Sequence, residues 1–145
     1  MTDEEKKLSE DNKTNSNQYS SKQILLVEDD DFLGELLEKK LSNSNLMVSR
    51  VKSGGEAFSF LKNNQASLIV LDIVLPQMDG YEILSKLKSD EDIKDIPVIF
   101  LSNLGQRYNI EKGESLGAEE FLVKSEVSLD EIVLKIKKVL DKFSL

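Results

Sequence analysis

Acidic side chains stand directly after two short apolar runs of the chain. The segment 28–31, with the sequence EDDD, follows the apolar residues 24–27, and Asp72 follows the apolar residues 68–71. Three or more carboxylates that converge at one place repel one another unless a cation joins them. Because their ligand atoms are all oxygens, they favour a hard ion such as Mg²⁺. These acids therefore predict a magnesium site if the fold brings them together.

A hydroxyl group and a lysine occupy similar positions further along the chain. Ser102 follows the apolar run 98–101, and Lys124 follows the run 121–123. A metal ion, a positive point charge and a hydroxyl donor together supply what a phosphoryl group requires. The chain has no histidine. A carboxylate is therefore the phosphoryl acceptor that this set offers, and Asp72 is the central one.

The elements that must position these residues follow from the apolar pattern. Short runs rich in Leu, Ile and Val are typical of strands covered on both faces, and apolar residues at helical spacing separate them. Ser53 and Ser128 begin capping boxes, and Gly117 is expected to end a helix. The candidate strands are 24–27, 46–51, 68–71, 98–101 and 121–123, and the candidate helices are 31–41, 53–63, 81–87, 106–116 and 129–143.

Strands that alternate with helices predict an α/β fold with a doubly wound, five-stranded parallel sheet. In such a sheet the ligand site lies outside the carboxyl ends of the strands. The acids, Ser102 and Lys124 would then share one rim. Taken singly, the acids could be helix caps and Lys124 a surface charge. Their joint placement favours a functional site.

Composition limits the classes of function. The chain has 145 residues, a formal net charge of −8 and no cysteine, which suits one domain without disulfides. Residues 1–22 are polar and are expected to form a disordered tail before a domain at 23–145. The acidic balance predicts no direct DNA binding, and the short apolar runs predict no membrane insertion. A cytoplasmic location is expected.

Four segments resemble the receiver domain of two-component response regulators. They are ILLVEDDDFL, LIVLDIVLPQMDGYEIL, PVIFLSN and GAEEFLVKS, and they begin at residues 24, 68, 97 and 117. The resemblance covers about residues 23–143. It implies the flavodoxin-like (βα)5 receiver fold and a phosphoprotein of phosphorelay signalling. It also implies that the protein is not a conventional enzyme, beyond its own phosphoryl transfer and dephosphorylation.

The resemblance implies a role for each acid. Asp72 would accept a phosphoryl group from a histidine kinase or a phosphotransfer protein. Glu28, Asp29 and the Asp72 carboxylate would hold Mg²⁺ together with the backbone carbonyl of Val74. The bound ion would be the cofactor of the reaction.

The resemblance also implies a conformational switch. Ser102 would hydrogen-bond to the phosphoryl group, and Lys124 would pair with it. The inward movement of Ser102 would vacate space for Phe121. A downstream protein would bind the surface formed by residues 105–116, 121–123 and 129–143, and phosphorylation could also produce a homodimer.

Two positions depart from the family's pattern. Ser125 follows Lys124, where the family usually has a proline with a cis peptide bond. Because a cis bond before serine costs about 3 kcal/mol, we expect a trans bond, which bears on the reach of Lys124. Val74 is apolar beside the phosphoryl site, which predicts slow hydrolysis of the phosphoryl group.

Two further interpretations stay open at this point. The first is a receiver-like interaction module that signals without phosphorylation. The second is a Mg²⁺-dependent phosphohydrolase of the haloacid dehalogenase type, although the segment from Asp72 to Val74 lacks that family's second acid. Since the sequence ends at Leu145, soon after the last candidate helix, we expect a stand-alone domain that acts by binding.

Overall fold

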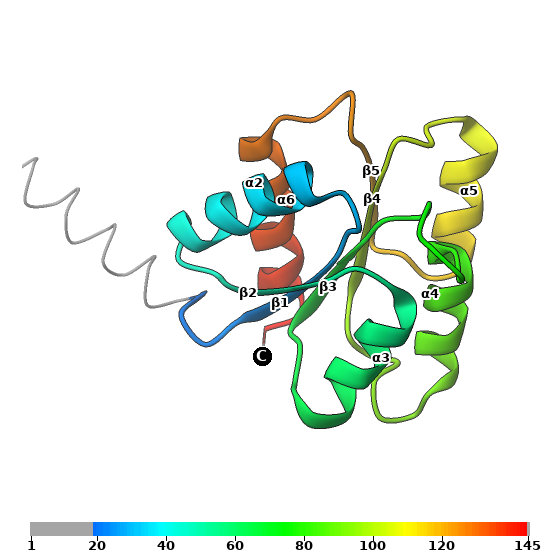
Figure 1. Ribbon diagram of the computed structural model, residues 1–145, viewed down its shortest axis with the longest axis horizontal. Coiled ribbons are helices and arrows are strands. Elements are labelled where there is room, and N and C mark those ends of the chain that lie inside the picture. The colour runs from blue at the N-terminus through cyan, green and yellow to red at the C-terminus, as the bar shows by residue number, and fades with distance from the viewer. Residues whose placement is uncertain (1–18, 145) are drawn as a thin grey trace, which may run out of the picture.

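Five strands alternate with five helices in the computed structural model, which describes residues 19–144 (Figure 1). The strands are β1 (Gln23–Val27), β2 (Met47–Val51), β3 (Leu68–Leu71), β4 (Val98–Ser102) and β5 (Glu120–Val123). The helices are α2 (Asp31–Asn43), α3 (Gly54–Asn63), α4 (Gly80–Ser89), α5 (Arg107–Ser115) and α6 (Leu129–Lys142). The predicted alternation is confirmed.

All five strands are parallel and lie in the order β2-β1-β3-β4-β5. Helices α2 and α6 cover one face of the sheet, and α3, α4 and α5 cover the other (Figure 1). This is the doubly wound α/β receiver fold expected from the sequence. In this order β1 and β3 are neighbours, so their carboxyl ends lie side by side.

Alternation along each strand divides the core into two clusters. Ile24 and Leu26 of β1 pack towards α2 and α6, whereas Leu25 and Val27 pack into the cluster on the α3, α4 and α5 side. Successive side chains of a strand point to opposite faces, so a strand covered on both faces must be apolar throughout. Every residue of β3 and β4 is accordingly buried. The central strands form a rigid base for the residues that follow them.

Polar side chains cap the helices where the sequence predicts it, but neither predicted capping box closes. Ser128 Oγ accepts from the Glu131 N–H, and the Glu131 carboxylate accepts from the Ser128 hydroxyl instead of from its N–H. The Oγ of Ser53 accepts a hydrogen bond from the Glu56 N–H at 3.2 Å. The Glu56 carboxylate, however, accepts from the Lys52 N–H instead of closing the expected box with Ser53. After α5, Gly117 has a φ of +105°, a conformation that L side chains rarely adopt, and this ends the helix as predicted.

The core begins earlier in the chain than the predicted boundary at residue 23. Tyr19 is only 7% exposed and belongs to the core cluster beside α6. Its hydroxyl donates a hydrogen bond to Asp141 Oδ1 at 2.9 Å. Aromatic burial outweighs the polar surroundings of this position in the sequence. Residues 1–18 of the predicted tail lie outside the described residues.

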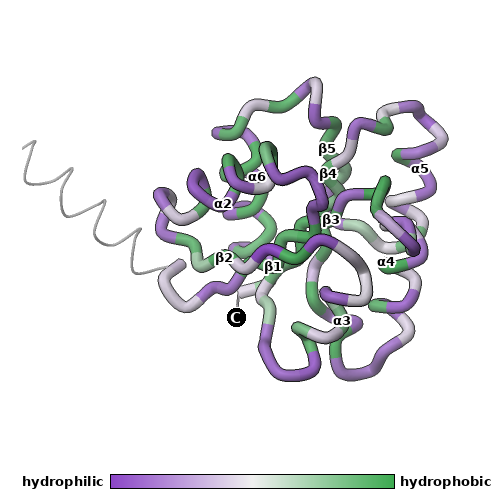
Figure 2. Tube along the Cα trace, viewed as in Figure 1, coloured by the Kyte–Doolittle hydropathy of each residue, from purple (hydrophilic) through white to green (hydrophobic). Residues whose placement is uncertain are grey.

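The helices expose polar residues and turn apolar ones towards the sheet. Figure 2 shows the hydrophobic colour concentrated in the strands, with hydrophilic stretches along the outer helices. The longest of the five described helices, α6, has 14 residues. Between residues 19 and 144, no helix has the length and apolar character needed to cross a membrane.

Candidate functional site

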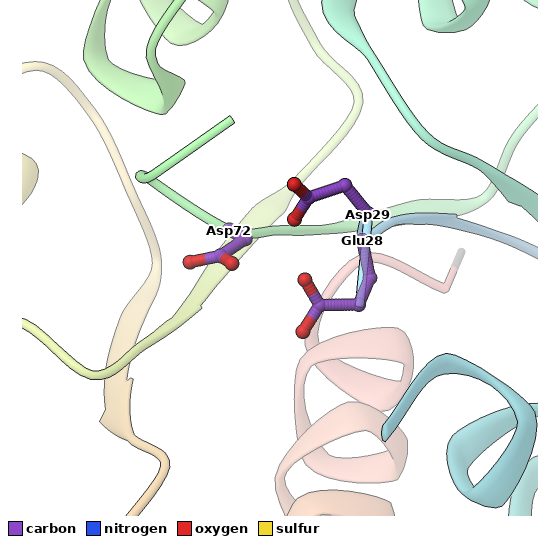
Figure 3. Close-up of side chains that lie close together, drawn as sticks. All are labelled: Glu28, Asp29 and Asp72. Atoms are coloured by element: carbon purple, nitrogen blue, oxygen red, sulfur yellow. The ribbon is translucent and has the colours of Figure 1, made fainter. Parts of the chain in front are cut away.

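Three carboxylates meet at the carboxyl ends of β1 and β3. Glu28 and Asp29 follow β1 directly, and Asp72 follows β3. The Asp72 N–H donates to the Val27 carbonyl at 3.1 Å, so strand pairing continues to the acid itself. One oxygen from each carboxylate lies within 4.8 Å of the others, and the three side chains converge in Figure 3. The fold therefore brings together acids that are more than 40 residues apart in the sequence.

Lys124 lies at the end of β5 and reaches across β4 to this cluster. Its Nζ donates to Glu28 Oε1 at 2.5 Å and to Asp72 Oδ2 at 2.9 Å. No peptide bond among residues 19–144 is cis, so the Lys124–Ser125 bond is trans as expected. Serine in place of the family's proline therefore leaves the lysine within reach of both acids.

Burial controls the charge of the site. Glu28 is 2% exposed and Asp72 is 6% exposed. Burial raises the pKa of Glu28 to about 7; the Lys124 hydrogen bond acts against this rise, and Asp72 adds to it. Burial also opposes the charge on Lys124, but hydrogen bonds to both acids hold the pKa of that ammonium above its usual value. The lysine is therefore the resident cation of the cluster.

The carboxylates offer what a hard divalent cation requires. Glu28 Oε2 is buried and accepts no hydrogen bond within the described part of the chain, whereas Asp29 is exposed to solvent. A buried acceptor without a partner costs free energy that a bound ion would recover. The set of oxygen ligands fits Mg²⁺ or Mn²⁺. Val74 lies in the next loop, with its side chain 62% exposed.

The other two predicted site residues, Ser102 and Phe121, lie in β4 and β5. Ser102 is fully buried at the end of β4, and its Oγ accepts a hydrogen bond from the Leu104 N–H at 3.3 Å. Its carbonyl accepts from the Lys124 N–H at 2.8 Å, which places the two residues beside each other on the rim. Phe121 is half-buried, and its ring centroid lies 5.7 Å from that of Phe100. The predicted exchange between Ser102 and Phe121 stays a prediction.

Two residues shape the site although the sequence did not single them out for it. A Cβ on Gly80 would lie 2.3 Å from the Asp72 carbonyl oxygen, so only glycine fits there. Arg50 donates from Nη1 to the Glu28 carbonyl at 3.0 Å. The dipeptide Asp79-Gly80 predicts a turn, but nothing in the sequence indicates that Gly80 lies so close to the Asp72 backbone. A single arginine near the end of a strand forms no sequence pattern from which its contact with Glu28 could be predicted.

One surface pocket lies away from these residues. It measures about 630 Å³ and lies between the carboxyl end of α3 and the loop before β4, with Phe58, Ile93 and Ile96 in its lining. This is the end of the sheet where strands begin. The acids lie at the opposite end, where the strands finish.

Comparison with known proteins agrees with this arrangement. The model of the response regulator receiver domain matches residues 24–137. The transcriptional regulatory protein SrrA of Staphylococcus aureus (strain NCTC 8325 / PS 47) is 33% identical over 120 residues, which are 83% of this chain and 48% of SrrA. The chain thus spans about half the length of the curated relatives it matches.

Solved structures show the same fold. A receiver domain of a signal transduction histidine kinase from Syntrophus aciditrophicus is 30% identical with a TM-score of 0.78, covering 86% of this chain and 93% of that one. The phosphorylated cyanobacterial phytochrome response regulator RcpA is 31% identical (TM-score 0.71; 81% and 90% covered). The Mn²⁺-bound response regulator Rcp1 is 28% identical (0.69; 84% and 93%). The chain belongs to the response regulator receiver domain family.

Proposed function

We propose that this receiver domain accepts a phosphoryl group on Asp72 from a histidine kinase or a phosphotransfer protein. The observation that carries the proposal is the contact between Asp72 Oδ2 and Lys124 Nζ, at 2.9 Å and beside two further acids. Response regulators are not conventional enzymes, and the family match removes the phosphohydrolase interpretation. A receiver domain implies a histidine kinase as partner.

The two oxygens of Asp72 have different surroundings. Oδ1 accepts a hydrogen bond from the Ile73 N–H at 2.7 Å, and Oδ2 contacts Lys124. In the proposed reaction a carboxylate oxygen attacks the phosphorus of a phosphohistidine. An O–P bond forms, the P–N bond breaks, and the imidazole nitrogen keeps the electron pair. Hydrolysis later returns the carboxylate when water takes up the phosphoryl group.

Each neighbour of Asp72 has a task in this proposal. Lys124 neutralises negative charge on the phosphoryl oxygens. Glu28 and Asp29, with Asp72 and the backbone carbonyl of Val74, would hold Mg²⁺, which supplies further neutralisation of those oxygens. The hydroxyl of Ser102 would then donate to the phosphoryl group. The similarity to the Mn²⁺-bound response regulator Rcp1 supports the binding of a divalent metal ion.

The output would be a change in protein binding. Phosphorylation adds charge and acceptor oxygens to Asp72, and we propose that Ser102 and Phe121 relay this change to the surface of α5, β5 and α6. A downstream protein, or a second copy of the chain, would bind there. In this proposal the domain works in the cytoplasm, alone or within a longer protein, without contacting DNA itself.

Intact-protein mass spectrometry after incubation with acetyl phosphate and Mg²⁺ tests the proposal. We expect a single phosphoryl adduct that is labile to base and requires Mg²⁺. The adduct should be absent from Asp72→Asn. Asp92→Asn is the matched control, because it removes an acid that lines the pocket at the other end of the sheet.

The results for the wild type and the two variants distinguish the remaining interpretations. An adduct in Asp92→Asn and none in Asp72→Asn supports the acceptor role. No adduct in the wild type, although Mg²⁺ binds, would contradict the proposal and favour a module that signals without phosphorylation. An adduct that persists in Asp72→Asn would place the acceptor elsewhere.

A further inference from the structure

Arg50, near the end of β2, ties together three points of the chain around the acidic loop. Its side chain is only 10% exposed. Nη1 donates to the Glu28 carbonyl at 3.0 Å, Nη2 to Asp31 Oδ1 at 2.9 Å, and Nε to Glu38 Oε1 at 2.6 Å. Glu28 directly precedes Asp29, and Asp31 lies two residues after it. One planar guanidinium therefore holds the chain on both sides of an acid proposed to bind the metal.

Other hydrogen bonds complete the anchoring of this short loop. The Glu28 N–H donates to the Val51 carbonyl at 3.0 Å, so both backbone groups of Glu28 have partners. Asp30 caps α2 by accepting from the N–H groups of Phe32 and Leu33. Asp29 thus lies between anchored neighbours, while its own side chain stays exposed beside Glu28 and Asp72. The loop is held by its backbone, and its carboxylate is left available.

The helix next to the loop leaves room for the guanidinium. A Cβ on Gly34 of α2 would lie 2.5 Å from Nη1 and 2.7 Å from Cζ of Arg50. Glycine inside a helix costs about 1 kcal/mol relative to alanine. The chain therefore has a helix-destabilising residue at the position of α2 that the arginine side chain crosses. Glycine at position 34 therefore leaves the space that the Arg50 side chain occupies.

We propose that Arg50 is a positioning residue for the metal site, which deepens the proposed function and rests on it. Its fork holds the Glu28 carbonyl and Asp31 so that Glu28 and Asp29 present their carboxylates to the ion. A purely electrostatic role predicts the opposite effect. Removing a positive charge near a cation site strengthens cation binding, whereas removing a positioning contact weakens it. The sign of the change therefore distinguishes the two roles.

Isothermal titration of the full chain with Mg²⁺ measures this sign. We expect Arg50→Gln to weaken binding by about tenfold, as is usual when a partner that orients metal ligands is lost. Arg50→Lys should also bind more weakly, because an ammonium keeps the charge but not the planar fork. Gly34→Ala should weaken binding with the arginine still present, because its Cβ displaces the guanidinium.

Two further variants and a stability measurement serve as controls. Lys40→Gln breaks the pair between α2 and Asp130 of α6, away from the loop, and should leave Mg²⁺ affinity within about twofold, as expected for an exposed ion pair. Asp29→Asn removes a proposed ligand and must weaken binding. Thermal unfolding of each variant shows whether it folds. Should Arg50→Gln not fold, Gly34→Ala decides the question, since alanine favours the helix.

The outcomes separate this inference from the proposed function. Equal or tighter Mg²⁺ binding by Arg50→Gln or Gly34→Ala overturns the positioning role, and so does wild-type affinity in Arg50→Lys. In each of these cases the metal site itself stands. If the wild type binds no Mg²⁺, or if Asp29→Asn changes nothing, the proposed metal site fails and this inference fails with it.

Discussion

At the scale of single residues, Lys124 makes the acidic cluster tolerable without a metal ion. Glu28 and Asp72 are both buried, and each of these carboxylates contacts the lysine Nζ. Two buried carboxylates side by side would otherwise repel each other, and one would take up a proton. A divalent ion bound to the same carboxylates would compensate their negative charge in the same way. Lys124 and the proposed ion would therefore both neutralise the carboxylates of this site.

Lys124→Gln tests this balance. In EDTA we expect the free energy of unfolding to fall by about 3 kcal/mol, because a buried pair loses one partner. Saturating Mg²⁺ should restore part of this loss, since the ion binds the folded acids. Urea unfolding with and without Mg²⁺ measures both. Lys135→Gln, which removes an exposed pair with Glu120, should change stability by less than about 1 kcal/mol. Equal effects of the two substitutions would refute this account.

At the scale of elements, the connection between β3 and α4 determines where Asp72 sits. Gly80 begins α4, and its N–H donates to the Ile73 carbonyl at 2.8 Å. The backbone therefore turns back against the residue that follows β3. This close approach fixes the loop that carries Val74, the proposed source of a backbone ligand.

Gly80→Ala should destabilise the domain by about 2 kcal/mol, because the added Cβ meets backbone atoms that cannot move aside. Gly55→Ala is the matched substitution, also in the first turn of a helix. The nearest atom to its Cβ would be Ser53 Oγ at 4.0 Å, so we expect a gain of about 0.5 kcal/mol. Thermal unfolding of both variants checks the difference. If Gly80→Ala proved as stable as Gly55→Ala, the tight turn would be irrelevant to folding.

At the scale of the whole molecule, the segment before β1 closes the core on the side of α6. Tyr19 is buried there, and Lys137 Nζ lies 5.1 Å from the centre of its ring. Burial raises the pKa of the Tyr19 hydroxyl, and the hydrogen bond to Asp141 and the charge of that carboxylate add to the rise. The two ends of the described chain are thus joined through one side chain.

Tyr19→Phe should cost about 1 kcal/mol at pH 8, the usual value of one hydrogen bond. Because the pKa is higher in the folded state, the unfolded state ionises first, and wild-type stability falls as pH rises through about 10. The difference between wild type and variant should therefore shrink between pH 8 and pH 10.5. Urea unfolding at both values measures it, with the exposed Tyr108→Phe as control. A difference that grows with pH would contradict the assignment.

Local sequence patterns are enough to predict the order of the elements and the residues at the ends of the strands. Apolar runs and helical spacing are local patterns, so residues 24–27 and 68–71 indicate strands before any contact between them is known. The parallel sheet follows from their alternation with helices. The rule that ligands bind at the carboxyl ends then places Glu28 and Asp72 on the same rim of the sheet.

How these residues meet depends on the packing of distant segments. The order of strands makes β1 and β3 adjacent and lets Lys124 reach both acids from β5. The burial of Tyr19, the contacts of Arg50 and the close approach of Gly80 also depend on segments distant in the sequence. Local periodicity carries no information on such pairs, because their contacts form when the layers pack. The sequence therefore indicates which residue types could form the site, and the fold determines how they are arranged.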